Sequence, residues 1–97
     1  MKTKEMIKKF NDEDVEEIDF ENIQNKLSNR QDLHAFLLLD KLCPSDGDII
    51  CSAEHDKIWL DVDIKKLAKV ITDEQIQELR ACGVVFDEDI EGLFMFA

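Results

Sequence analysis

The amino-acid sequence predicts an α+β domain, because segments with helical spacing alternate with short segments that have the two-residue period of strands. A buried central helix is predicted over residues 31–42, and two β-hairpins are predicted over residues 49–62 and 84–96. A pair of helices lies between the hairpins, which together would form a small antiparallel sheet. With 97 residues in all, we expect one domain over residues 19–97, preceded by an N-terminal arm over residues 1–18.

The predicted arm has an uneven distribution of charge. Residues 1–9 hold four lysines and one glutamate, whereas residues 10–21 hold seven acids and no base. Such a pattern is typical of a mobile or weakly held segment. Met6, Ile7 and Phe10 are nevertheless spaced for one apolar turn of helix.

Two helices are predicted before the only proline. Phe20, Ile23 and Leu27 recur at helical spacing, which indicates a short helix over residues 20–27 with Asp19 as its N-cap. A capping-box pattern over residues 28–31 then starts the helix over residues 31–42. Apolar residues cover nearly every face of this second helix, which predicts burial on more than one side. Pro44 requires it to end by residue 43.

The hairpins and the helices between them have clear local signals. Residues 49–53 and 57–62 form the first hairpin, around a turn at residues 54–56. Asp63 caps a helix over residues 64–71, and Thr72 with Gln75 forms a capping box for a helix that ends near residue 82. Gly83 suits the left-handed position after that helix. Residues 84–86 and 93–96 form the second hairpin, whose last strand is apolar on both faces and therefore central or covered by a partner.

Composition restricts the classes of partner. Acids number 23 and bases 12, so the net charge is −11, and such a surface repels nucleic acid and bare anionic membranes. We expect a cytoplasmic protein, because no apolar run is long enough for a signal peptide or a membrane span. The three cysteines, which contain no CxxC pair, are expected to be reduced and mostly buried.

Three stretches of the sequence resemble a group of small, acidic proteins encoded by phages and prophages. They read DLHAFLLLDKL, EHDKIWLDVDIKKLAKV and RACGVVFDEDIEGLFMFA, and the resemblance extends over residues 32–97. The group has no established activity, so the resemblance transfers no functional residue. It implies a phage accessory protein that acts inside a bacterial host, where small acidic phage proteins often bind and disable host machinery.

No catalytic residue and no cofactor are expected. His55, between Glu54 and Asp56, has the composition of a general base or metal ligand, but a solvated hairpin turn explains it better. A Cys51–His55 nucleophile pair lacks an orienting third group, and His34 is expected to be partly exposed or hydrogen-bonded at the edge of the core.

The acidic loop at residues 87–92 matches part of a calcium-binding pattern. Its acids and Gly92 match positions 1, 3, 5 and 6 of an EF-hand loop, but the sequence ends before the glutamate required at position 12. An EF-hand is therefore excluded. Weak binding of Ca²⁺ and a purely solubilising acidic loop both stay open, and we expect no dedicated metal site.

The acidic surface itself is the leading candidate for function. In a helix, Glu13, Glu16, Glu17 and Glu21 would share one face, where like charges cost about 0.2–0.5 kcal/mol per pair. Such a face persists because the segment is unfolded or because a partner binds it. The alternative is a face that only solubilises the protein. The expected binding residues are Asp12, Glu13, Asp14, Glu16, Glu17, Glu21, Asp61, Asp63, Asp87, Glu88, Asp89 and Glu91.

The function expected from these features is binding of a basic host protein. Such a protein would be a nuclease or another nucleic-acid-binding factor, and the carboxylates would imitate the charge of DNA, as in anti-restriction or anti-CRISPR inhibitors. One alternative is a structural adaptor that forms a homodimer through its last strand and Trp59, an interface anchor if it is exposed instead of packed under a helix. A second alternative is a metal-dependent protein built on His55.

Overall fold

A computed structural model describes residues 1–96 and confirms the α+β fold. Four α-helices, one short 3₁₀ helix and four strands follow one another along the chain. Their order and bounds are α1 (Thr3–Asn11), η1 (Phe20–Asn22), α2 (Gln31–Leu42), β1 (Ile50–Glu54), β2 (Lys57–Leu60), α3 (Ile64–Val70), α4 (Asp73–Ala81), β3 (Val85–Asp87) and β4 (Gly92–Phe96).

The strands form one antiparallel sheet in the order β1-β2-β4-β3, so the two hairpins join through β2 and β4. Trp59 on β2 lies opposite Phe94 on β4, and Leu60 lies opposite Leu93. Because β4 is a central strand, both of its edges pair with other strands. This central position is the first of the two alternatives that the sequence left open.

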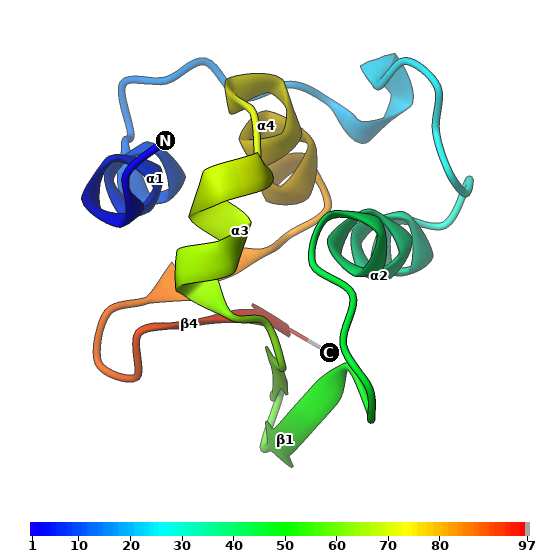
Figure 1. Ribbon diagram of the computed structural model, residues 1–97. Coiled ribbons are helices and arrows are strands. Elements are labelled where there is room, and N and C mark those ends of the chain that lie inside the picture. The colour runs from blue at the N-terminus through cyan, green and yellow to red at the C-terminus, as the bar shows by residue number, and fades with distance from the viewer. Residues whose placement is uncertain (97) are drawn as a thin grey trace.

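The helices all cover the same face of the sheet. Figure 1 shows α1, α2, α3 and α4 above the sheet and no helix below it. The core lies between the two layers and includes Leu60, Phe86, Leu93 and Met95 from the sheet. From the helices it includes Met6, Phe10, Ala35, Leu38, Leu39, Leu67, Ala68, Ile76 and Leu79.

The N-terminal segment differs from the expected arm, because residues 3–11 form a helix that belongs to the core. Met6 is fully buried and Phe10 is nearly so, and α1 contacts α3, α4 and β3. Arg80 on α4 donates a hydrogen bond to the carbonyl of Lys9 at 3.1 Å. One apolar turn is enough to hold this helix, because its two large side chains fill space that the rest of the sheet and helices leave open.

The helical pair α3–α4 begins at the predicted caps. The carboxylate of Asp63 accepts hydrogen bonds from the backbone N–H groups of Lys65 and Lys66, at 3.1 and 3.2 Å. Thr72 and Gln75 form a complete capping box, in which each side chain accepts a hydrogen bond from the backbone of the other. Gly83, with φ of +89°, occupies the left-handed position after α4, as predicted.

Loss of the α4 capping box gives a first testable effect. Thr72→Ala is expected to lower the free energy of unfolding by about 1 kcal/mol, because the N–H of Gln75 loses its acceptor. Urea denaturation followed by circular dichroism measures the change. Ser52→Ala, at an exposed strand position, is the matched control and should change stability by less than about 0.5 kcal/mol. Equal effects of the two substitutions would contradict the role of Thr72.

The predicted helix over residues 20–27 is wrong, since only the 3₁₀ turn Phe20–Asn22 forms there. The backbone of Ile23 is extended and Asn25 has a positive φ of 57°, which ends any helix. Phe20 and Ile23 still reach the core, but Leu27 stays 42% exposed. An isolated helix of this length is only marginally stable in water. Because only two of the three apolar side chains are buried, core packing does not stabilise a helix here. Asp19 accordingly makes no capping hydrogen bond.

Helix α2 has the predicted bounds but neither the predicted cap nor complete burial. Arg30 occupies the N-cap without a side-chain hydrogen bond, whereas the hydroxyl of Ser28 accepts from the N–H of Arg30 in a local turn. Leu33 and Leu37 are 41% and 39% exposed. Helix α2 stands at the side of the helical layer (Figure 1), so only one of its faces meets the core.

Candidate functional site

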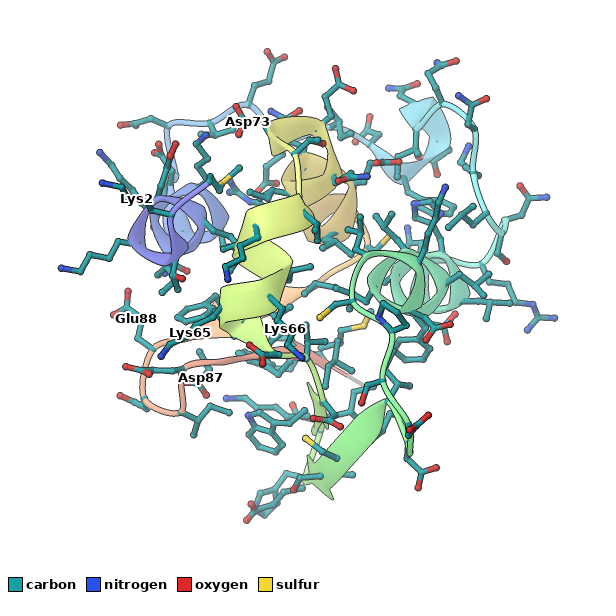
Figure 2. The ribbon with its side chains drawn as sticks, in the orientation of Figure 1. Lys2, Lys65, Lys66, Asp73, Asp87 and Glu88 are labelled. Atoms are coloured by element: carbon teal, nitrogen blue, oxygen red, sulfur yellow. The ribbon has the colours of Figure 1, made fainter. Side chains whose placement is uncertain are left out.

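Two acidic segments that are far apart in the sequence meet at one corner of the molecule. The amide of Asn11, the last residue of α1, donates a hydrogen bond to a carboxylate oxygen of Glu88 at 3.1 Å. Figure 2 shows Glu88 pointing from the β3–β4 loop toward α1. A surface hollow at this point is lined by residues of both segments. We call Asp12, Glu13, Asp14 and Glu88 the acidic corner.

In the part of the chain that the structure describes, the carboxylates of the acidic corner form no close ion pairs, although Lys4 and Lys8 of α1 line the same hollow. Within residues 1–96, none of the four forms an ion pair within 4.0 Å. They also gather just after the C-terminus of α1, where the helix dipole is negative and a carboxylate costs about 0.3–1 kcal/mol. Asp12 partly offsets this cost, because its side chain accepts a hydrogen bond from the N–H of Asp14 at 2.9 Å. Fold stability alone therefore does not account for the charge collected here.

The structure does not bring all the predicted acidic residues together. Residues 12–19 contain no helix, so Glu13, Glu16 and Glu17 do not form the shared face that they would have in a helix. Helix α1 ends at Asn11, before the acidic run begins. Glu17 instead lies 3.4 Å from Arg80.

The remaining predicted acids have local roles or separate positions. Asp63 caps α3 as predicted, and β2 ends at Leu60, so Asp61 lies just after the strand and not within it. In the β3–β4 loop, Asp87 accepts a hydrogen bond from the N–H of Asp89 at 2.9 Å. Asp89 and Glu91 are exposed in that loop beside Glu88.

Half of the basic residues of the chain lie on helices α1 and α3. Helices α1 and α3 carry six of the twelve basic side chains and only one acid, a charge of +5. The rest of the chain therefore carries a net charge of −16, and the two parts add up to the total of −11. Figure 2 shows Lys65 and Lys66 at the start of α3 and Lys2 at the start of α1.

The residues considered for chemistry do not assemble into a site. The side chain of His55 is 85% exposed at a left-handed turn position, and Cys51 donates weakly to the carbonyl of Trp59 at 3.5 Å. In residues 1–96 no group of three or more His, Cys, Asp or Glu side chains is placed to hold a metal ion. Of the cysteines, only Cys82 is fully buried, and this burial raises the pKa of its thiol to about 11.

His34 is more deeply buried than its sequence context predicts. The side chain is 1% exposed and stacks edge-on against Phe20. Its Nδ1 accepts a hydrogen bond from the N–H of Leu27 at 3.1 Å, which places the ring proton of neutral His34 on Nε2. Nε2 lies 3.5 Å from a carboxylate oxygen of Glu78 and has no hydrogen-bond partner within the described part of the chain. His34 thus ties the irregular segment before α2 to the helical layer.

The face of the sheet that carries no helix is aromatic. Trp59 and Phe94 lie side by side on it, with ring centroids 6.3 Å apart, and Phe96 packs edge-on against Phe94 at 5.4 Å. The ammonium of Lys57 lies 4.7 Å from the centroid of the Phe94 ring. Val85 completes the group, which we call the outer sheet face. Trp59 is half-buried there among strand neighbours, so it lies neither beneath a helix nor fully in solvent.

Comparison with known proteins gives no independent assignment. No family model, curated protein or solved structure matches this chain. Among the helices of residues 1–96, none combines the length and the apolar character needed to cross a bilayer.

Proposed function

We propose that this protein is a non-catalytic binding protein whose acidic corner engages a basic protein in place of nucleic acid. The observation that supports this proposal is the meeting of the two acidic segments at Asn11 and Glu88 without ion pairs. The partner would be a nuclease or another nucleic-acid-binding factor of a bacterial host. The resemblance to small phage proteins agrees with an inhibitor or modulator of that kind.

The density of carboxylates supports a DNA-like surface. Residues 12–14 are three successive acids, and one strand of a DNA duplex carries one phosphate for about every 3.4 Å of helix axis. The loop containing Glu88 and its acidic neighbours adds further negative charge beside them.

Electrostatic attraction would act mainly on the rate of association. Complementary charge raises association rate constants toward 10⁸–10⁹ M⁻¹s⁻¹ at low salt. Salt at about 0.1 M screens exposed charges beyond about 10 Å, so this gain should decrease steeply with ionic strength. Salt dependence is therefore the property that separates this function from contact through an apolar surface.

Neutralising the acidic corner is expected to reduce binding to basic DNA-binding proteins. The quadruple variant Asp12→Asn, Glu13→Gln, Asp14→Asn and Glu88→Gln removes four charges and keeps side-chain size. Its association rate constant with a purified histone-like protein or a basic nuclease should fall by about tenfold or more at low salt. Stopped-flow or surface-plasmon measurements over a salt series would show the change, and duplex DNA should compete with the wild-type protein.

A second quadruple variant controls for total charge. Asp40→Asn, Asp46→Asn, Asp48→Asn and Glu54→Gln neutralises the same number of exposed acids around α2 and β1. This control should keep most of the wild-type rate constant. If both variants lose binding equally, net charge and not the acidic corner drives association. If wild-type protein binds no basic protein, or binds equally at low and high salt, the proposed function is wrong.

A further inference from the structure

The outer sheet face is an apolar surface that the helices of this chain leave open. Phe94 is only 6% exposed, yet it is not part of the core between the sheet and the helices. Its ring faces away from the helices and is covered by Trp59, Phe96 and Lys57. Phe96 is 59% exposed and Val85 is 37% exposed on the same face, and the side chain of Ile90, 55% exposed, approaches Gly92 nearby. A contiguous apolar face of this kind on a strongly charged protein indicates an interaction surface.

Strand register fixes how residues are arranged over the outer sheet face. The middle row runs across the sheet through Ser52, Trp59, Phe94 and Val85. One flanking row holds Lys57 between Glu54 and Phe96. The other flanking row holds Asp87 opposite Gly92.

The second flanking row continues to Asp61. This residue follows β2 and is the next position of the Lys57–Trp59 alternation. Its backbone N–H still donates to the carbonyl of Ile49 at 2.7 Å, so the pairing of the two strands persists there. The face therefore has Lys57 with Glu54 and a large ring at one end, and Asp61 and Asp87 with a glycine at the other.

We propose that a second copy of this chain packs on the outer sheet face, about a two-fold axis along the Trp59–Phe94 row. Such an axis reverses the order of the rows, so each flanking row of one copy faces the opposite flanking row of the other. Lys57 then faces Asp61 of the second copy, and Phe96 faces Gly92 and the side chain of Ile90 beside it. The middle rows face each other, which brings the aromatic rings of both copies together at the centre.

The arrangement agrees with the physical rules for symmetric interfaces. In a two-fold dimer the same patch serves both partners and must be complementary to itself, a condition that the two Lys57–Asp61 pairs and the facing apolar middle rows meet. Two sheets packed face to face keep their strands nearly aligned, which this axis produces. Aromatic pairs at the centre with charged groups at the rim reproduce the anatomy of stable interfaces.

The dimer and the proposed binding of a basic protein have opposite responses to salt. Two copies that each carry −11 repel one another, and salt screens this repulsion. Burial of aromatic surface does not weaken with salt. The dimer should therefore persist or strengthen at ionic strengths that release a basic partner from the acidic corner. Failure of one proposal thus leaves the other measurable.

Reciprocal charge exchange tests the interface and its register. Lys57→Glu alone places two acids opposite each other at both ends of the dimer, and Asp61→Lys alone places two lysines there. Each single variant should be monomeric or at least tenfold weaker in self-association, measured by sedimentation equilibrium at high micromolar concentration. An equimolar mixture of the two variants restores opposite charges at both ends, so it should recover dimers of wild-type affinity.

The mixture also guards against misfolding, because variants that do not fold cannot recover by mixing. Far-UV circular dichroism and urea midpoints of each single variant check the fold directly. A monomeric wild-type protein at high micromolar concentration would overturn the proposal. A dimer that both single variants leave intact, as expected for pairing through the exposed edge of β1, would overturn it as well. Single variants that dissociate and do not recover on mixing would overturn the assigned register.

Discussion

Replacing Phe10 with alanine is expected to lower the free energy of unfolding by about 3–5 kcal/mol, because a large ring leaves a packed core and a cavity remains. Phe10 is 5% exposed and anchors α1 against α3, α4 and β3. Since small domains are stable by only about 5–15 kcal/mol, this loss is a large fraction of the total. Urea denaturation monitored by far-UV circular dichroism and tryptophan fluorescence should show a markedly lower midpoint.

The control for this prediction is Lys8, an exposed residue on the same helix. Met6→Ala should cost about 2–5 kcal/mol, because Met6 is fully buried, whereas exposed Lys8 replaced by alanine should cost less than about 0.5 kcal/mol. If Phe10→Ala lowers stability no more than Lys8→Ala, α1 is a weakly held arm and not part of the core. This experiment thus decides between the sequence-based expectation and the structure.

Leu93→Ala is expected to cost about 2–5 kcal/mol, because Leu93 is 1% exposed and faces the helices from the centre of the sheet. The neighbouring outward positions should behave differently. Phe96→Ala removes a larger side chain, yet it should cost less than about 1 kcal/mol in the monomer, because 59% of Phe96 is already exposed. Urea denaturation at low protein concentration measures both variants under conditions that disfavour self-association.

The contrast between Leu93 and Phe96 tests the one-sided sheet. Comparable losses from the two substitutions would mean that both faces of β4 are covered within one chain, contrary to the arrangement in Figure 1. At high protein concentration the expectation changes, because a dimer through the outer sheet face would make Phe96→Ala more costly. The stability of a dimer depends on concentration, whereas that of a monomer does not.

The acidic corner and the outer sheet face serve different kinds of contact. Exposed carboxylates raise the rate of association but add little to the affinity of a complex, since exposed ion pairs contribute about 0–1 kcal/mol each. Buried aromatic side chains dominate the energy of lasting contacts. A dimer would also present two acidic corners to one basic target, which raises apparent affinity where the target spans both.

Local chemistry made several elements predictable from sequence alone. The caps at Asp63 and Thr72 depend on side-chain hydrogen bonds within four residues, so neighbours in the chain determine them. Gly83 is determined in the same way, because its left-handed backbone needs no tertiary contact. The two-residue alternation from Ile58 to Leu60 likewise identified β2 and the inward direction of its side chains.

The tertiary structure alone decided which apolar segments became helices and which surfaces stayed open. Phe20 and Ile23 are buried without a helix, whereas α1 is helical because Met6 and Phe10 have a place in the core. The acidic corner was invisible in sequence, since residues 12–14 and Glu88 meet only when β3 packs beside α1. The sequence therefore determined charge, caps and strand alternation, which are local properties. Long-range packing determined the neighbours of each face, because burial depends on what the rest of the chain places there.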